Sequence, residues 1–334
     1  MSIHKGGGFG MKAIVINQLG GPEVMIYQEV PMPKYEADEV LIRVLKTSVN
    51  FADVKNRRGQ KSKGNFPLIL GLDLVGVIEE VGEEVKDLEV GQRVIAFPKS
   101  GSYAEYAVAH ELLTYPIPAN ISMETAAASP IVSFLSYQLL HSVGGLQQGE
   151  SVLIHSGAGG VGTTAIRMAK YLGAKQIFAT VGHESKMEKA LQVGADAVFT
   201  YDNFTEKIIT KTEGEGVNLV LDSVAGNVTA RSVACLSLYG RLVHFGNSSG
   251  EVGEVKTKDV HASCRSFLGY SLGTTRKHKP ELLKKISGHV IKLLQSKAIE
   301  VEIGHQFYLQ EMSEAHKLIE ERRHQGKIII HVND

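Results

Sequence analysis

The feature that most constrains the fold is a glycine pattern directly after a short apolar segment. Residues 151–156 read Ser-Val-Leu-Ile-His-Ser, which is typical of a buried strand, and Gly157, Gly159 and Gly162 follow with the spacing G-x-G-x-x-G. A helix-compatible run comes next. In this context the first glycine permits a tight turn, the second lets the backbone approach a pyrophosphate, and the third lets helix and strand pack closely. The pattern therefore predicts a dinucleotide site at a helix N-terminus; a glycine-rich turn without a ligand is the alternative.

Composition excludes several classes of function. Lys+Arg and Asp+Glu number 36 each in 334 residues, so no global charge favours nucleic acid or an acidic membrane as a partner. No apolar run reaches the roughly 18 residues that a membrane span needs. Residues 1–10 are glycine-rich without an apolar core, which predicts a disordered leader and not a secretory signal. Cys235 and Cys264 are too few for a disulfide framework or a cysteine-based metal site. We therefore expect a cytoplasmic protein with two domains.

Two patterns of secondary structure divide the chain. From residue 11 to about 119 short strands alternate with glycine and proline turns, which predicts a compact β domain. Its expected strands are 12–16, 40–47, 74–81, 93–96 and 103–108. From about 130 strands and helices alternate, which predicts an α/β domain with a doubly wound parallel sheet. Its expected strands are 151–156, 176–181, 197–201, 217–224 and 241–246, and its expected helices are 160–172, 184–192, 204–211 and 227–238.

The tail beyond Cys264 follows neither pattern throughout. Its expected elements are a strand at 266–272, a helix at 280–296, a strand at 301–309, a helix at 313–323 and a strand at 327–332. Periodicity alone leaves open whether this tail extends the parallel sheet or returns to the first domain.

The end of the second expected strand of the α/β domain favours NADPH over NADH. An NAD-preferring domain places an acid there, which bonds the ribose 2′-hydroxyl. In this chain Gly182 and His183 occupy the position, and Glu184 lies where it would cap the next helix. Lys186 follows in the first helical turn, where a cation would attract a 2′-phosphate. A solvated helix lysine is the alternative for Lys186.

With the glycines placed, the chain resembles the medium-chain dehydrogenase/reductases, and within them the zinc-free quinone oxidoreductase (zeta-crystallin-like) family. The motifs that carry the resemblance are Lys12-Ala-Ile-Val, Ser48-Val-Asn-Phe-Ala-Asp53, Gly71-Leu-Asp-Leu-Val-Gly76, Gly101-Ser-Tyr-Ala-Glu-Tyr106, Ser156-Gly-Ala-Gly-Gly-Val-Gly162, Gly194-Ala-Asp196, Asp222-Ser-Val224 and His244-Phe-Gly-Asn-Ser-Ser-Gly250. The resemblance implies a Rossmann domain at 131–267 and a GroES-like, mainly β catalytic domain formed by 11–130 and 268–334. It also implies a cofactor in the cleft between the domains, and homodimers joined at the edge strand 266–272.

The resemblance also assigns candidate cofactor residues. The glycine loop, with Gly157, Ala158, Gly159, Gly160, Val161 and Gly162, would cradle the pyrophosphate. Gly182 and Lys186 would border the 2′-phosphate, and Tyr201 would close over the adenosine end. Phe245, Gly246, Asn247 and Ser248 would line the nicotinamide side, and Arg322 and Lys327 are further candidates. Strand-end packing is the alternative for Tyr201 and Phe245, and a solvated helix end for Arg322 and Lys327.

Zinc is not expected. Zinc-dependent relatives carry a Cys and a His where this chain has Asn50 and Leu72, and segment 97–102 has no cysteine for a structural site. Without a metal to generate an alkoxide, the expected chemistry is NADPH-dependent reduction of quinones or conjugated enones. Asn50 is the candidate for orienting the cofactor or the substrate carbonyl. Asp53 either holds local structure or transfers a proton, and Lys55 either donates a hydrogen bond to a carbonyl or is a surface lysine.

Two alternatives to this function remain open at the level of sequence. Lys55 and Leu135 stand where many quinone oxidoreductases carry a tyrosine and a threonine, so the chain departs from the family pattern where the acceptor or the nicotinamide should lie. A 2-alkenal or enoyl reductase on the same fold is one alternative. A low-turnover NADPH-binding protein is the other.

Overall fold

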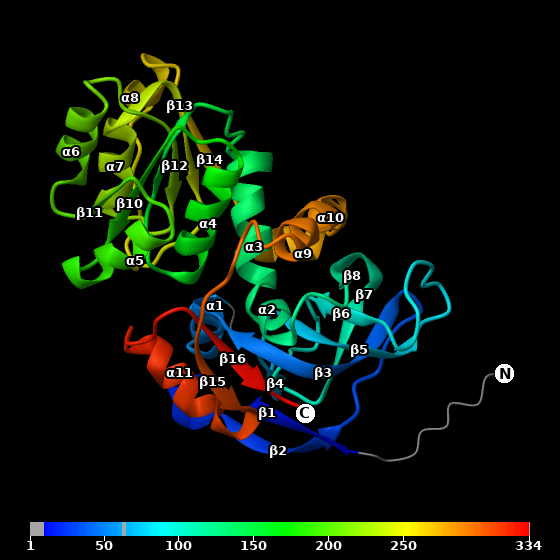
Figure 1. Ribbon diagram of the computed structural model, residues 1–334. Helices are drawn as coiled ribbons and strands as arrows, with labels where there is room; N and C mark the ends of the chain where they lie inside the picture. The colour runs from blue at the N-terminus through cyan, green and yellow to red at the C-terminus, as the bar shows by residue number, and fades with distance from the viewer. Residues whose placement is uncertain (1–9, 62–64, 334) are drawn as a thin grey trace. The chain divides into compact units, whose positions relative to one another are not determined.

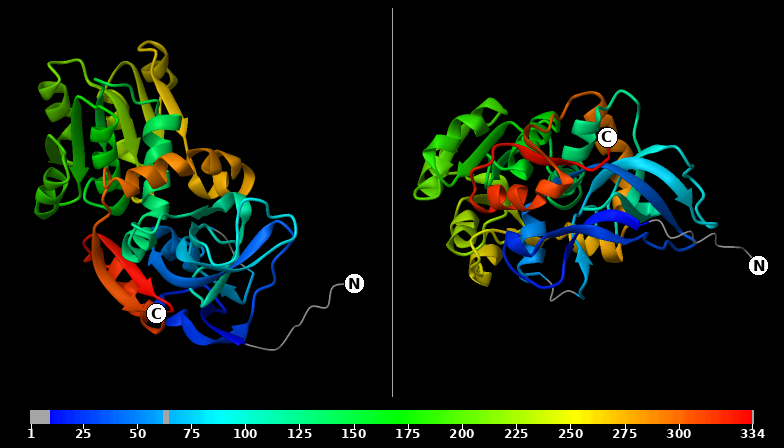
Figure 2. Two further views of the ribbon diagram at one scale, coloured as in Figure 1. Left: turned by 45° about the vertical axis from the view of Figure 1, so that its right-hand side comes forward. Right: turned by 90° about the horizontal axis from the view of Figure 1, so that it is seen from below.

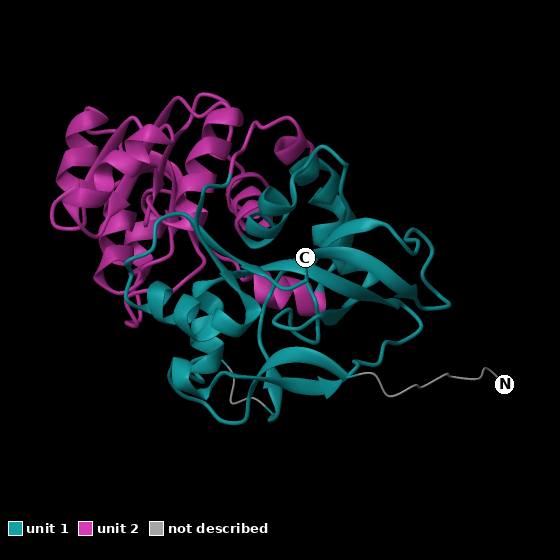
Figure 3. Ribbon diagram, turned by 60° about the horizontal axis from the view of Figure 1, so that its bottom comes forward, with its two compact units in different colours: residues 1–131, 279–291, 301–334 teal, residues 132–278, 292–300 magenta. Residues whose placement is uncertain are grey.

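The computed structural model describes residues 10–61 and 65–333, and the chain forms two compact units. Unit 1 comprises residues 1–131, 279–291 and 301–334, and unit 2 comprises 132–278 and 292–300 (Figure 3). The expected disordered leader, residues 1–10, lies outside the described residues except for Gly10. None of the helices in the described ranges is long and apolar enough to cross a membrane.

Unit 1 is built on two β-sheets. A seven-stranded sheet has the order β15-β16-β3-β5-β6-β8, with β7 also paired to β3, and a three-stranded sheet has the order β2-β1-β4. The strands are β1 (Gly10–Ile16), β2 (Ile26–Pro31), β3 (Glu39–Val49), β4 (Leu68–Ile69), β5 (Leu74–Val81), β6 (Arg93–Ala96), β7 (Tyr106–His110), β8 (Thr114–Pro116), β15 (Ile303–Tyr308) and β16 (Lys327–His331). The helices are α1 (Phe51–Arg57), α2 (Met123–Ala128) and α11 (Met312–Glu320).

The C-terminal segment belongs to the sheet of unit 1. Strand β16 pairs antiparallel with β3, with Ile328 opposite Val49 and Ile330 opposite Thr47. Figure 2 shows this red strand beside the blue strands of the N-terminal part. Residues 328–330 are buried, and an apolar strand of this kind is stable only when both of its faces are covered. The tail beyond Cys264 therefore divides between the units: β14 (Ser266–Gly269) extends the parallel sheet, residues up to 278 and 292–300 lie in unit 2, and residues 279–291 and 301–334 lie in unit 1.

Unit 2 is a doubly wound α/β unit, as the sequence predicts. Its six parallel strands have the order β11-β10-β9-β12-β13-β14, and helices lie on both sides of the sheet (Figure 1). The strands are β9 (Ser151–Ile154), β10 (Gln176–Val181), β11 (Ala197–Thr200), β12 (Val217–Asp222), β13 (Leu236–His244) and β14 (Ser266–Gly269). The helices are α4 (Gly160–Tyr171), α5 (Met187–Gln192), α6 (Phe204–Lys211), α7 (Asn227–Ala234), α8 (Thr257–His261) and α9 (Leu272–His278). Helices α3 (Pro130–Tyr137) and α10 (Glu281–Gln295) have residues in both units.

Several predicted boundaries are wrong, for reasons of tertiary pairing. The expected helix 227–238 ends at Ala234, because Leu236 pairs with Val217 of β12 and starts β13 five residues earlier than predicted. The strand expected at 103–108 is β7, which begins only at Tyr106. The strand expected to reach Leu272 ends at Gly269, and α11 ends at Glu320 and not at Arg323. These bounds depend on which strand each residue pairs with, and periodicity along the sequence carries no information about that pairing.

Candidate cofactor and active site

The glycine loop joins β9 to α4 with the packing that a dinucleotide site needs. A Cβ atom on Gly157 would lie 2.7 Å from the Cβ of Ala179, and one on Gly162 would lie 2.2 Å from the carbonyl oxygen of Ser156. At both positions an added side chain would clash with neighbouring protein atoms, so the fold requires glycine there. At Gly159 the nearest atom is 3.3 Å away, and no other lies within 4 Å. The middle glycine thus faces open space at the N-terminus of α4, and a bound pyrophosphate fits there.

Tyr201 lies against this loop. Its hydroxyl accepts a hydrogen bond of 3.0 Å from the backbone N–H of Ser156, at the start of the glycine loop. Arg231 donates to the carbonyl oxygen of Tyr201 and so holds the end of β11. The predicted cofactor residue is therefore brought to the glycine loop, and it is also packed near the ring of His155, 5.8 Å away between centroids.

The other predicted residues of unit 2 lie at the carboxyl ends of the parallel strands. Gly182 and Lys186 are exposed just after β10, which leaves Lys186 accessible to a phosphate. Phe245 and Ser248 follow β13, and their N–H groups donate to the carbonyl oxygens of Asp222 and Ser223 at 2.9 and 3.0 Å. Residues 245–248, which include Gly246 and Asn247, are half-buried. Ligands of open α/β sheets bind at this edge.

In unit 1, Asn50 is held by a buried polar cluster. Its Nδ2 donates to Asp73 Oδ1 at 3.1 Å and to Ser48 Oγ at 3.3 Å, and its Oδ1 accepts from Lys327 Nζ at 2.7 Å. An ammonium only donates and a carboxylate only accepts, so a single orientation of the amide satisfies both neighbours. Asn50 is 7% exposed. Its two N–H donors are thus committed, and the second lone pair of Oδ1 is the remaining hydrogen-bonding capacity of the side chain.

Three buried ionisable groups surround this amide. Burial raises the pKa of Asp73, raises the pKa of Asp53 to about 7, and lowers the pKa of Lys327. The positive charge of Lys327 opposes this effect on both carboxyl groups. Asp53 also anchors the start of α1, because its Oδ2 accepts from the backbone N–H of Asn50 at 2.9 Å. Burial therefore moves the pKa of Asp53 from the usual range of a carboxyl group towards neutrality.

Asp73 and Ser48 were not among the predicted site residues, although both lie in motifs that carry the family resemblance. The signal was present, because Asp73 is a carboxylate between Leu72 and Leu74 in an apolar segment, and a buried charge needs partners. Lys327 was predicted as a candidate contact for the cofactor. The structure places its side chain at 5% exposure on Asn50, where it contacts the amide oxygen and the Val49 carbonyl oxygen at 3.3 Å.

Two predicted residues lie apart from this cluster. Lys55 is half-buried on α1 with its ammonium 5.7 Å from the centre of the Phe51 ring, and burial lowers its pKa. Arg322 is exposed in the turn after α11, with a left-handed backbone at φ 55°. The structure therefore unites Asn50, Asp53 and Lys327 but not Lys55 or Arg322.

The positions where zinc-dependent relatives carry their ligands have no metal-binding chemistry in this chain. Asn50 has a committed amide, and Leu72 has no ligand atom. Across residues 10–61 and 65–333, no group of three or more His, Cys, Asp or Glu side chains is arranged to hold a metal ion.

Comparison with known proteins identifies relatives over the whole length. Residues 36–119 match the family described as "Alcohol dehydrogenase GroES-like domain", and residues 160–288 match "Zinc-binding dehydrogenase". The chain is 32% identical to 321 residues of a phenolphthiocerol/phthiocerol polyketide synthase protein of Mycobacterium tuberculosis, which cover 95% of this chain but only 14% of that protein.

Shorter relatives match from end to end. The chain is 32% identical to the "Quinone oxidoreductase" of Rattus norvegicus, covering 96% of this chain and 97% of the relative. A crystal structure of Escherichia coli quinone oxidoreductase complexed with NADPH is 30% identical, with a TM-score of 0.87 over 96% of this chain and 99% of that chain. The chain therefore belongs to the quinone oxidoreductase family of the medium-chain dehydrogenase/reductase superfamily.

Proposed function

We propose that the protein is an NADPH-dependent reductase of quinones or related conjugated carbonyl compounds. The observation that carries the proposal is the glycine loop, where Gly157 and Gly162 are required by packing while Gly159 leaves room for a ligand. Full-length similarity to quinone oxidoreductases, one of them solved with NADPH, supports the same cofactor. When bound, NADPH supplies a hydride. The acceptor gains this hydride together with a proton from the solvent.

We propose that Asn50 orients the nicotinamide and does not donate to the substrate. Both of its N–H groups are used by Asp73 and Ser48, and only a lone pair of Oδ1 remains. Such an acceptor matches the N–H₂ group of a nicotinamide carboxamide. It does not match a substrate carbonyl, which also only accepts. Lys327 then acts through Asn50, because it fixes the amide in this orientation.

The absence of ligand chemistry at Asn50 and Leu72 supports a reaction without zinc. Oxidation of an alcohol profits from a metal that stabilises the alkoxide. An electron-poor quinone or enone requires mainly alignment with the hydride donor. The buried Asn50 cluster is suited to alignment, because Lys327, Asp73 and Ser48 already fix the amide before a ligand binds.

The test is loss of nicotinamide absorbance with purified protein, NADPH or NADH, and a panel of quinones and 2-enals. Faster oxidation of NADPH than of NADH with a quinone is the expected result. Turnover with 2-enals alone would establish the second candidate, a 2-alkenal or enoyl reductase, which the similarity to a segment of a polyketide synthase supports. NADPH binding without turnover across the panel would contradict the proposal and leave a low-turnover NADPH-binding protein.

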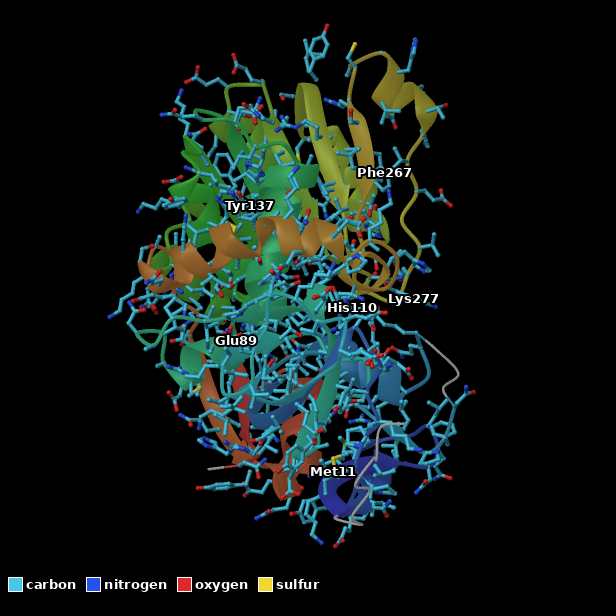
Figure 4. The ribbon with its side chains drawn as sticks, turned by 90° about the vertical axis from the view of Figure 1, so that its right-hand side faces the viewer. Met11, Glu89, His110, Tyr137, Phe267 and Lys277 are labelled. Atoms are coloured by element: carbon cyan, nitrogen blue, oxygen red, sulfur yellow. The ribbon has the colours of Figure 1, made fainter. Side chains whose placement is uncertain are left out.

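We also propose a homodimer formed at β14, the edge strand of the parallel sheet of unit 2. An edge strand presents unpaired backbone groups to a partner. Phe267 on this strand, labelled in Figure 4, is 43% exposed, and Leu238 and Tyr239 of the neighbouring β13 are 69% and 73% exposed. Light scattering at micromolar concentration tests this proposal, and a monomeric mass would refute it.

A further inference from the structure

Unit 2 has a surface cavity that the proposed function leaves unused, and we call it the basic cavity. It lies between the C-terminal end of α4 and the segment that follows α10, both of which belong to unit 2. Its volume is about 260 Å³, and it is lined by Arg167, Lys170, Tyr171, Lys297, Ala298 and Glu300. Helix α4 begins at the glycine loop and ends at this cavity, and its 12 residues span about 18 Å. The basic cavity is therefore separate from the dinucleotide site.

The basic cavity has an excess of positive charge. Arg167, Lys170 and Lys297 are cations, and Glu300 is the one acid of the lining. None of the three cations forms an ion pair with an acidic side chain among the described residues. Cations at a helix C-terminus balance its dipole, but the ends of α4 and α10 supply only about half a negative charge each. After these charges and that of Glu300 are counted, about one positive charge remains uncompensated and favours an anion.

Arg167 is fixed in a way that leaves part of its guanidinium available. Its Nη1 donates to the backbone carbonyl oxygen of Glu300, which holds the side chain at the cavity. Within the described part of the chain, Nε and Nη2 donate to no other residue. These two groups form one planar edge of the guanidinium, and such an edge donates two parallel hydrogen bonds to a phosphate or a carboxylate. The half-buried Arg167 thus presents a pre-organised pair of donors to an anion.

Lys297 has a backbone conformation that glycine would adopt at lower cost. Its φ is 57°, in the left-handed region, just after the end of α10. Helices commonly end with a glycine in this conformation, and any other residue there is strained. The Lys297 side chain is exposed and forms no hydrogen bond or ion pair with another described residue, so no such contact within the fold compensates for the strain. A ligand bound by its ammonium group would account for a lysine at this position.

We propose that the basic cavity binds a small phosphate monoester. Such a group carries about 1.5 to 2 negative charges at pH 7 and has three strong acceptor oxygens. These oxygens match the donor edge of Arg167 and the ammonium groups of Lys170 and Lys297, and the charge exceeds that of a single carboxylate. A volume of about 260 Å³ lies below the roughly 300–1,000 Å³ of sites for drug-sized ligands, which favours a small ester over a dinucleotide. The proposal goes beyond the proposed function and does not depend on it.

The test is thermal unfolding with about 10 mM glycerol 3-phosphate, against sodium chloride at the same ionic strength. For a Kd of about 1 mM, the monoester should raise the melting temperature by roughly 3–5 °C. Lys297→Gly should raise the melting temperature without the monoester by about 1–3 °C, because glycine suits the left-handed backbone, yet it should reduce the monoester's effect to about 1 °C. Glu213→Gly is the matched control, because Glu213 is exposed after α6 with φ 54°. It should be similarly stabilised and keep the full effect.

A second variant, Lys170→Gln, removes another charge of the lining without changing the left-handed residue, and it should also reduce the monoester's effect. Any binding of the monoester at the glycine loop would contribute equally in all four proteins, because none of the substitutions lies in that loop. The same rise of melting temperature in all four proteins, or no rise in the unchanged protein, would overturn the proposal. The measurement involves neither NADPH nor turnover, so its outcome is independent of whether the protein is a reductase.

Discussion

The glycine loop allows a paired experiment, because Gly159 and Gly162 are three residues apart but differ in what surrounds them. In Gly159→Ala the new Cβ would meet one atom, at 3.3 Å, and the backbone angles of −81° and 170° suit any residue. The folded state should be nearly unaffected. In Gly162→Ala the Cβ would lie 2.2 Å from the Ser156 carbonyl oxygen and 2.8 Å from Gly157 Cα. Backbone atoms must then move.

The two substitutions should affect different quantities, protein stability for Gly162→Ala and NADPH affinity for Gly159→Ala. Gly162→Ala should cost about 3 kcal/mol, the upper range for overpacking, which corresponds to a fall in melting temperature of roughly 6–12 °C. Gly159→Ala should instead weaken NADPH binding by about 10- to 100-fold, because the Cβ occupies the space where backbone N–H groups approach a phosphate. Its melting temperature without ligand should stay within about 2 °C of the unchanged protein.

Thermal unfolding without ligand and fluorescence titration with NADPH measure these two effects. The refuting result is Gly159→Ala with unchanged NADPH affinity. In that case the open space at Gly159 is not where the pyrophosphate binds, and the argument from the glycine loop fails even if the enzyme is active. Gly162→Ala with an unchanged melting temperature would show that the loop relaxes without cost.

Three further outcomes are expected. Lys186→Glu should reduce the preference for NADPH over NADH by about tenfold, since an exposed charge contributes up to about 1 kcal/mol and the substitution reverses it; kinetics with both cofactors measure this. Lys327→Met should lower both kcat and the melting temperature, because Asn50 loses the partner that fixes its amide and the buried Asp53 and Asp73 lose a neighbouring positive charge; kcat is measured well below the melting transition so that the two effects are separated. Burial lowers the pKa of His155 to about 4, below its unfolded value, so this side chain should contribute a loss of about 3 kcal/mol of stability as pH falls from 6.5 to 4, and denaturant titrations should show that loss in the difference between the unchanged protein and His155→Gln.

Much of the α/β unit could be predicted from the sequence because its elements are defined locally, although helices α8 and α9 were not predicted. Strand β10 and helix α6 have the predicted bounds, and the glycine spacing placed the start of α4 correctly. Local pattern did not predict where α7 ends, since the pairing of Leu236 with Val217 decides it. Helix α1 was missed for a related reason: it is seven residues long and is stabilised by Asp53 and by the buried contacts of Arg57.

The candidate site was predicted in part for the same reason. Asn50, Asp53 and Lys327 were named as individual residues, but their meeting requires a strand pairing between residues far apart in sequence. Asp73 stands in an apolar segment, where its charge indicates that it needs partners but not which residues these are.

The pairing of β16 with β3 has a consequence for synthesis of the chain on the ribosome. Strand β3 is complete once residue 49 has emerged, yet its neighbour β16 begins at Lys327, more than 270 residues later. Residues 132–278 of unit 2 are all made in this interval and contain the whole six-stranded sheet. We therefore expect unit 2 to fold first. Until β16 has been made, one edge of β3 is unpaired, and Asp53 and Asp73 lack the neighbouring charge of Lys327. In a nascent chain halted before Lys327, we therefore expect the Asn50 amide to lack the donor that fixes its orientation.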